Sequence, residues 1–246
     1  MLLHDTALVY GRYLRQSLRS RFALLFGVLT PLLYLLFFGP LLTGLPLGGQ
    51  GSSWQVLVPG LLLQLGLFGA LFAGFTVIME KGQGVVERMR VTPVSRLALL
   101  LGRVLRDATV FVFQAVLLVP AALVMGPRAP LAGILIGFAF VALLTVSLAS
   151  LSYALGMKVR TPQEFGPLIN MVSMLLSGLM LPMTFAPAWL DVLSHFVPFR
   201  YLVDAVRDAY VGEYTSGHML YGVLVAVGFA VLAVTAGTRV FRTAGA

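Results

Sequence analysis

Residues 131–157 read LAGILIGFAFVALLTVSLASLSYALGM, a run that contains no charged side chain. At a rise of about 1.5 Å per residue, a helix of this length crosses the roughly 30 Å hydrocarbon core of a bilayer. The whole chain has the same character, since 59% of its 246 residues are hydrophobic, its mean hydropathy is +0.96 and only 11% are charged. A soluble domain usually carries about 25% charged residues. We therefore predict an all-α membrane protein and not a soluble protein with a large core.

Six segments of the chain are long and apolar enough to be spans. We predict six transmembrane helices, at residues 22–42, 55–79, 97–125, 131–157, 165–181 and 219–238. The fifth segment is the shortest and only just reaches across the hydrocarbon core. Because no internal repeat, low-complexity tract or domain linker separates these segments, we expect residues 1–246 to form a single transmembrane domain.

The positive charges are distributed unevenly between the connections. Fourteen of the 17 Lys and Arg residues lie before the first span, around the second connection, at the fourth connection or after the last span. The other three are Arg128, Arg200 and Arg207. By the positive-inside rule, this asymmetry predicts a multi-pass protein of an inner or plasma membrane with both termini in the cytoplasm. Since the basic residues bracket apolar spans, the net charge of +8 predicts contact with membrane lipid and no nucleic-acid partner.

The first 21 residues, 1–21, have the pattern of an amphipathic helix. Apolar side chains recur at spacings of three and four on one predicted face, at Leu3, Ala7, Tyr10, Leu14 and Leu18. Polar side chains occupy the opposite face, at Arg12, Arg15, Gln16 and Arg19. This division predicts an interfacial helix whose arginines lie near anionic head groups. A plain charged leader is the alternative.

Residues 182–217, before the last span, are too charged to cross the membrane and too apolar for a free loop. Pro187 and Pro198 should divide the segment into two short helices. The charged side chains of the second helix recur along one stripe, at Arg200, Asp204 and Arg207. Ion pairs can form along such a stripe. We predict an extracellular re-entrant helical hairpin that enters the outer leaflet and returns, with a folded extracellular cap as the alternative.

Several catalytic motifs are missing from the sequence. Neither Lys81 nor Lys158 lies in a phosphate-binding loop, so we expect no ATP site and no cofactor in this chain. The three histidines, His4, His195 and His218, lack metal-ligand spacing, and there is no cysteine. Neither an HExxH sequence nor a nucleophile elbow is present. We therefore expect no catalytic residue, no metal site and no enzymatic activity.

The polar residues that lie deep in the predicted spans are few, and they are Gln64, Gln114 and Asn170. Such amides line a path or form hydrogen bonds between helices. Four of the spans have no charged residue in their interior, which argues against an ion-coupled carrier. Small residues spaced by four occur as the pairs Gly133/Gly137, Ala226/Ala230 and Ala233/Gly237. These pairs permit close helix packing, within the subunit or across a dimer.

The stretch EKGQGVVERMRVTP, residues 80–93, interrupts the apolar chain with five charges. Gly82 and Gly84 should loosen the exit from the second span. Residues 85–91 can form a short helix that exposes mixed charge. Thr92 is a suitable N-cap for a helix that begins at Pro93 and continues into the third span. A solvated loop whose arginines only enforce topology is the alternative.

This stretch resembles the signature loop of the type-2 permeases of ATP-binding-cassette (ABC) exporters, the family of daunorubicin and other drug exporters. The matching residues are Glu80, Gly84, Glu87, Arg88, Thr92, Pro93, Val94, Ser95 and Arg96, followed by LLLGRVLRD. A second stretch, PFRYLVDAVRDA from Pro198, is similar to the family's landmark before the last span. That landmark usually begins Asn-Pro and ends in Arg. Here Val197 replaces the asparagine, while Pro198 and Arg207 agree.

The resemblance implies that residues 80–96 form a cytoplasmic coupling helix and its flanks. This helix would dock on a separate ABC ATPase subunit, present in two copies, which binds ATP and Mg. Glu87 and Arg88 would contact the ATPase, and Glu80 and Gly84 would fix the entry of the helix. The other implied coupling residues are Arg90, Thr92 and Pro93. A second permease subunit, in a homodimer or heterodimer, would complete the transport path.

By the same resemblance, the first, second and fifth spans would face the path of the substrate. Gln64, Phe68 and Asn170 are the candidate path residues, and Pro198, Asp204 and Arg207 are the corresponding residues of the hairpin. The expected function is the permease subunit of an ATP-driven exporter of a drug-like, lipid or glycan substrate. The alternatives are an ATP-independent carrier or channel and a non-transporting scaffold, including an inactive partner in a heteromeric exporter.

Overall fold

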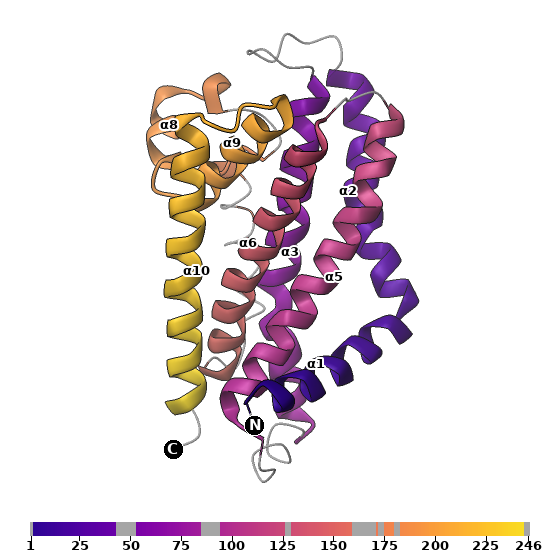
Figure 1. Cartoon of the computed structure of the whole chain (residues 1–246), viewed down its shortest axis with the longest axis vertical. Coiled ribbons are helices and arrows are strands. Elements are labelled where there is room, and N and C mark those ends of the chain that lie inside the picture. The colour runs from indigo at the N-terminus through magenta and orange to yellow at the C-terminus, as the bar shows by residue number, and fades with distance from the viewer. Residues whose placement is uncertain are drawn as a thin grey trace.

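The structure is a computed structural model that describes residues 2–42, 53–84, 94–125, 129–158, 171, 175–179 and 183–243 (Figure 1). These residues form eight α-helices, one short 3-10 helix and no strand. The elements are α1 Leu2–Arg19, α2 Arg21–Leu42, α3 Ser53–Gly82, α5 Arg96–Met125, α6 Leu131–Lys158, η1 Met183–Phe185, α8 Ala188–Ser194, α9 Pro198–Val211 and α10 Gly217–Thr243. The all-α prediction is confirmed for this part of the chain.

Five of the described helices, α2, α3, α5, α6 and α10, are long and apolar enough to cross a membrane. They match the first, second, third, fourth and sixth predicted spans, so the protein is a multi-pass membrane protein. The fifth predicted span, residues 165–181, falls largely outside the described residues, and a total of six spans stays a prediction.

Helices α3 and α6 form the centre of the bundle, while α2 and α10 lie at its edges (Figure 1). Small residues allow the central pair to cross closely: a side chain at Gly74 would collide with the backbone of Ser152. The Ser152 hydroxyl donates to the carbonyl of Leu71 at 2.6 Å and accepts from the Gly74 amide at 2.8 Å. Where no water can satisfy polar groups, this reciprocal pair joins the two backbones without leaving a hydroxyl unpaired.

The small-residue pairs noted in the sequence pack within the subunit. A side chain at Gly133 would collide with the backbone of Ala209 in α9. At Gly237 in α10, an added Cβ would lie 2.9 Å from the carbonyl oxygen of Ser150 in α6. The sequence left intrasubunit and dimer packing open, and these contacts assign both glycines to intrasubunit packing.

Helix α1 lies across the end of the bundle at which α10 finishes (Figure 1). The predicted helix is confirmed, but the face that packs on α5 consists of Thr6, Val9 and Tyr13. Of the apolar face identified in the sequence, Leu3, Ala7 and Leu18 are exposed, whereas Tyr10 and Leu14 are partly buried. The interfacial position of α1 stays a prediction.

Helices α8 and α9 lie at the opposite end of the bundle from α1 (Figure 1). Pro187 is the N-cap of α8, and Pro198 is the first residue of α9. The predicted division of this segment by two prolines is therefore confirmed. Helix α9 ends at Gly212, whose φ of 95° is the left-handed conformation that glycine adopts most readily. The re-entry of this segment into the bilayer stays a prediction.

The predicted start of the third membrane helix at Pro93 is wrong. Val94 and Ser95 precede the helix, and α5 begins at Arg96. The Ser95 hydroxyl accepts a hydrogen bond from the amide of Ala98 at 3.1 Å, which is the geometry of an N-cap. Two neighbouring hydroxyl residues could serve as caps, and the sequence alone favoured Thr92 because a proline follows it.

Candidate functional site

The exit from α3 is closed by glycine and tied to α6. Gly84 has a φ of 68° and its amide donates to the carbonyl of Lys81 at 3.0 Å, which ends the helix. The Lys81 ammonium donates to the carbonyl of Met157 at 2.7 Å, near the C-terminus of α6, where a cation is favourable. The last turn of α3 is thereby held in place immediately before residues 85–93.

Glu80, in this last turn, lies at a junction of three helices. One of its carboxylate oxygens, Oε2, is 2.5 Å from the guanidinium of Arg103 in α5. The Tyr13 hydroxyl of α1 donates to the same oxygen at 3.3 Å and accepts from Arg103 at 2.8 Å. The three side chains therefore form a closed, charge-assisted triangle that joins α1, α3 and α5.

A second group of contacts begins one turn further along α5. Asp107 accepts a hydrogen bond of 2.5 Å from the hydroxyl of Tyr153 in α6 and lies 2.6 Å from the guanidinium of Arg106. The Arg103 guanidinium is 5.0 Å from the ring centre of Tyr13 and 5.9 Å from that of Tyr153. We call Tyr13, Glu80, Arg103, Arg106, Asp107 and Tyr153 the α5 cluster.

Tyr13 is the member of the α5 cluster that lies in α1, outside the membrane spans, and burial affects its pKa. Loss of water raises the pKa of the Tyr13 hydroxyl, and the nearby Arg103 guanidinium opposes this shift without cancelling it. Tyr13 therefore stays protonated, and its hydroxyl donates a hydrogen bond to Glu80. Because Arg103 and Asp107 are both buried, removing either one would leave a partner charge without compensation, which is costly in a low-dielectric interior.

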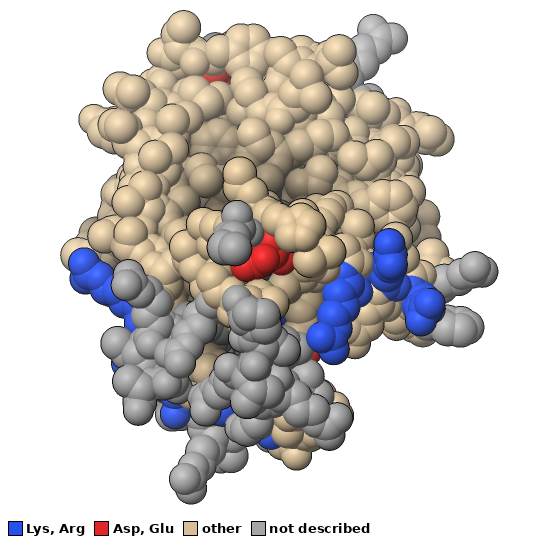
Figure 2. Space-filling view, turned by 60° about the horizontal axis from the view of Figure 1, so that its bottom comes forward, with Lys and Arg blue, Asp and Glu red and all other residues tan. Residues whose placement is uncertain are grey.

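The structure brings only some of the predicted coupling residues into this site. Glu80 belongs to the α5 cluster, and Gly84 lies four residues beyond it. The other candidates fall outside the described residues, namely Glu87, Arg88, Arg90, Thr92 and Pro93. Turned so that this end of the molecule comes forward, Figure 2 shows Lys and Arg side chains on both flanks of the face.

Sequence reasoning gave Arg103 and Asp107 no contact role, although both lie within the predicted span 97–125. In the structure they lie in the second and third turns of α5 and are buried. One signal was available: the two charges are four residues apart, the spacing at which side chains share a helix face. An apolar helix that retains such charges needs partners for them.

A pocket of about 250 Å³ lies between α2, α3 and α5. Two of the predicted path residues, Gln64 and Phe68, line it, and Gln114 of α5 faces the same space. The third, Asn170, falls outside the described residues. Two glycines allow α5 side chains to pack against α2 and α3. A side chain at Gly27 would collide with the Gln114 amide, and one at Gly69 would collide with the Phe111 ring.

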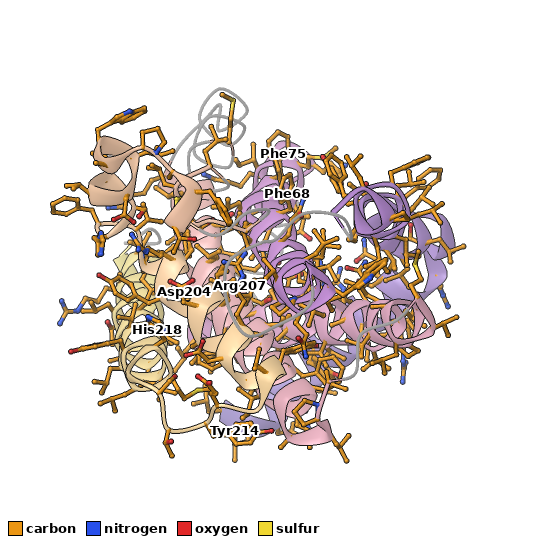
Figure 3. The ribbon with its side chains drawn as sticks, turned by 90° about the horizontal axis from the view of Figure 1, so that it is seen from above. Phe68, Phe75, Asp204, Arg207, Tyr214 and His218 are labelled. Carbon is orange, nitrogen blue, oxygen red and sulfur yellow. The ribbon has the colours of Figure 1, made fainter. Side chains whose placement is uncertain are left out.

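At the other end of the molecule, Arg207 joins α9 to the bundle. Its guanidinium donates to the carbonyls of Gly178 at 2.7 Å and of Val56 at 3.3 Å. Figure 3 shows Arg207 beside Asp204 at the centre of this end. The ion pairs predicted along α9 are confirmed, with Asp204 lying 3.6 Å from Arg207 and 3.7 Å from Arg200.

Asp204 and Arg207 have shifted pKa values because burial removes them from water. Burial lowers the pKa of the Arg207 guanidinium to about 10, and Asp204 limits the shift. Burial also raises the pKa of Asp204, although Arg207 and Arg200 oppose that change. Arg207 stays charged at neutral pH and can hold its backbone carbonyls. No group of three or more potential metal-binding side chains occurs among the residues that the structure describes.

The sequence profile of the ABC-2 type transporter family matches residues 5–211. This chain belongs to the ABC-2 type transporter family. The match covers α1 through α9, so both the α5 cluster and the α2/α3/α5 pocket lie within it. Membership identifies the chain as a membrane transport permease and implies that it works with an ABC ATPase.

Individual relatives agree with this assignment. A "putative transport permease ycf38" from Cyanophora paradoxa is 25% identical over 216 residues, which cover 85% of this chain and 74% of the relative. The protein of that name from Pyropia yezoensis is 27% identical over 219 residues, with 85% and 75% covered. A "probable multidrug ABC transporter permease YbhR" from Escherichia coli K12 is 26% identical over 166 residues, or 65% of this chain and 45% of the relative.

Proposed function

We propose that this chain is the membrane subunit of an ATP-driven exporter powered by a separate cytoplasmic ATPase. The single observation that carries the proposal is the α5 cluster. It joins the last turn of α3 to the first turns of α5, the two helices on either side of residues 85–93. A short segment whose two flanking helices are joined by a largely buried ion pair is a suitable point for a partner to apply force.

In this mechanism, two ATPase subunits bind ATP and Mg, close on each other and displace residues 85–93 of each permease. Glu80 and Arg103 make the ends of α3 and α5 move together, because separating them would leave the buried Arg103 charge without its carboxylate partner. Tyr13 transmits the movement to α1, and the contact between Asp107 and Tyr153 transmits it to α6. The helices around the transport path then change their tilt as a group.

The charge distribution supports the orientation that this mechanism needs. Helix α1, the start of α5 and the end of α10 lie at one end of the bundle, and Lys and Arg side chains flank that end (Figures 1 and 2). By the positive-inside rule this end faces the cytoplasm of an inner or plasma membrane. Two permease subunits, identical or different, meet so that a drug-like, lipid or glycan substrate passes between them.

The decisive experiment reverses the charges of the segment that should contact the ATPase. The permease is purified with its ATPase partner, reconstituted in proteoliposomes and assayed for ATP hydrolysis and for export of a fluorescent amphipathic dye. We expect the double substitution Glu87→Lys and Arg88→Glu to lower export per ATP hydrolysed by about tenfold or more, the scale of one lost charge-assisted contact. Coupled export at the unmodified level in this variant would refute the coupling assignment.

A matched control uses a charge at the other end of the molecule. Glu213 follows α9 and is exposed, so Glu213→Lys changes a charge without touching the α5 cluster. Export per ATP should stay unchanged in this variant. A permease alone, given a proton or sodium gradient and no ATPase, should transport nothing, and transport under those conditions would favour an ATP-independent carrier.

A further inference from the structure

Helix α1 presents three arginines that have no acidic partner among the described residues. Arg12, Arg15 and Arg19 are all exposed, and none of the ion pairs in the described part of the chain includes them. Because they are spaced by three and then four residues, their side chains leave the helix on one side. Asp5 is the one acidic residue of α1, so the helix carries a net positive charge. This exposed charge favours an anionic partner.

The direction in which these arginines point is fixed by the packing of α1 on α5. A side chain at Gly102 would collide with Val9 and would lie 2.9 Å from the amide nitrogen of Tyr10, so the two helices touch closely there. The Tyr10 hydroxyl lies 3.1 Å from the Thr109 hydroxyl, within hydrogen-bond distance. Helix α1 therefore cannot rotate about its own axis without breaking these contacts.

The neighbouring span places the arginines near the level of the lipid head groups. The apolar part of α2 begins at Leu24, and the next residues, Leu25 and Phe26, are already exposed. Arg19 precedes Leu24 by five residues, which is at most about 8 Å at 1.5 Å per helical residue. The head-group layer on each side of a bilayer is about 5–7 Å thick. A long arginine side chain at this position reaches the lipid phosphates.

Apolar side chains among the arginines favour lipid over a water-soluble acidic partner. Leu8 is 61% exposed and lies seven residues before Arg15, on the same side of the helix. Leu3 and Leu18 are also exposed. Exposed leucines beside arginines match the boundary between anionic head groups and acyl chains. A basic cluster on an amphipathic helix beside a span is typical of binding to anionic lipid.

We propose that α1 binds anionic phospholipids of the cytoplasmic leaflet through Arg12, Arg15 and Arg19. The guanidinium groups contact the phosphates, and the exposed leucines contact the upper part of the acyl chains. Figure 2 shows Lys and Arg side chains on the flanks of this end of the molecule, the part of a membrane bundle that lipid surrounds.

The bound lipid also activates coupling, a step that rests on the proposed function. Helix α1 is tied to α5 at Gly102 and to α3 through the hydrogen bond from Tyr13 to Glu80. Lipid contact holds α1 at the head-group level while α3 and α5 move. Displacement of residues 85–93 then tilts the spans instead of lifting α1 off the bilayer. Lipid binding itself does not depend on this step.

The binding test uses one fluorescent label on α1. Because the chain contains no cysteine, Gln16→Cys creates a single labelling site at an exposed position. The labelled full chain is placed in phosphatidylcholine nanodiscs with a small fraction of phosphatidylglycerol or phosphatidylcholine that carries a nitroxide quencher on its acyl chain. We expect phosphatidylglycerol to be preferred by about fivefold or more, the factor for one arginine at an anionic surface. Equal quenching by the two lipids would overturn the site.

Substitution of the arginines provides the second arm. The triple variant with Arg12→Gln, Arg15→Gln and Arg19→Gln should lose the preference, while the matched triple change to lysine keeps the charges and should keep it. If the glutamine triple variant does not fold, the three single variants decide, and each should lower the preference. Persistence of the full preference in the glutamine variants would refute the assignment.

A transport assay separates this inference from the proposed function. In proteoliposomes that contain the ATPase, phosphatidylglycerol should raise export per ATP hydrolysed several-fold for the unmodified chain and leave the glutamine triple variant unchanged. Lipid binding without this increase would refute the activation and leave the site standing. Loss of the ATPase from the glutamine variant in detergent, with its lipid preference intact, would show instead that the arginines bind the ATPase. Failure of the proposed function itself would be detected independently, by intact coupling in the Glu87 and Arg88 variant.

Discussion

Two buried arginines, Arg103 in α5 and Arg207 in α9, lie toward opposite ends of the molecule and differ in their partners. The partners of Arg103 include the side chains of Glu80 and Tyr13, whereas Arg207 donates to backbone carbonyls at Gly178. Backbone carbonyls are fixed by the local fold, while long side chains can exchange partners by rotation. The comparison predicts a rigid junction at α9 and an adjustable one at the α5 cluster.

The largest effect is expected from Arg207→Met. This substitution removes the donors for the carbonyls of Gly178 and Val56 and leaves Asp204 with Arg200 alone. The free energy of unfolding should fall by about 4 kcal/mol, because backbone carbonyls lose a charged donor at a cost of about 1–3 kcal/mol each. Denaturant titration in detergent measures this loss, with Glu213→Ala as the exposed control. A loss below about 1 kcal/mol would contradict the rigid junction.

Arg103→Met should have a smaller effect on stability and a larger one on coupling. Because Glu80 is partly exposed, its charge can be rehydrated, and we expect a loss of about 2 kcal/mol. Adding Glu80→Gln should restore part of this loss, since neither charge is then left alone. ATP hydrolysis should continue while export falls in both variants. A double variant less stable than Arg103→Met would contradict the ion pair as the main interaction.

Tyr153→Phe removes one hydroxyl from the α5 cluster and keeps the ring. Asp107 loses the 2.5 Å hydrogen bond but retains Arg106, so the unfolding free energy should fall by about 1 kcal/mol. Tyr221→Phe in α10 is the matched control, because Tyr221 is exposed. Equal stability losses at both positions would show that the Tyr153 hydroxyl contributes nothing specific.

The smallest effect concerns pH at the α9 end. Burial raises the pKa of Asp204, so the folded protein binds its proton more tightly than the unfolded chain does. The stability from this group is complete below the unfolded pKa of about 3.9 and declines as pH rises through the folded pKa. Asp204→Asn should abolish that decline, measured as the difference in unfolding free energy between the two proteins across this pH range. A stability difference that increases with pH over this range would contradict a raised pKa of Asp204.

The sequence predicted the helical elements better than the contacts between them. Apolar runs located the five described spans, and prolines located α8 and α9, because length, apolarity and missing amide hydrogens are local properties. The buried face of α1 was not predictable in this way. Thr6, Val9 and Tyr13 are no more apolar than their neighbours, and only the position of α5 selects them.

In the candidate sites, too, the sequence identified single residues but not the contacts between them. Gln64 and Phe68 were recognised as path residues because they lie deep in a span, but their meeting with Gln114 depends on the packing of α2, α3 and α5. Glu80 was recognised from the family's motif. Its partners Tyr13 and Arg103 are 67 and 23 residues away, and no local pattern indicated that they would meet.

Composition and periodicity by themselves determined that this chain is a helical membrane protein, and the uneven Lys and Arg distribution predicts its orientation. These properties follow from transfer free energies that sum along the chain, residue by residue. The tertiary structure alone decided which charges are buried together. Such pairing depends on the distances between helices. In a low-dielectric interior, the electrostatic energy of a pair changes strongly with the distance between its two groups.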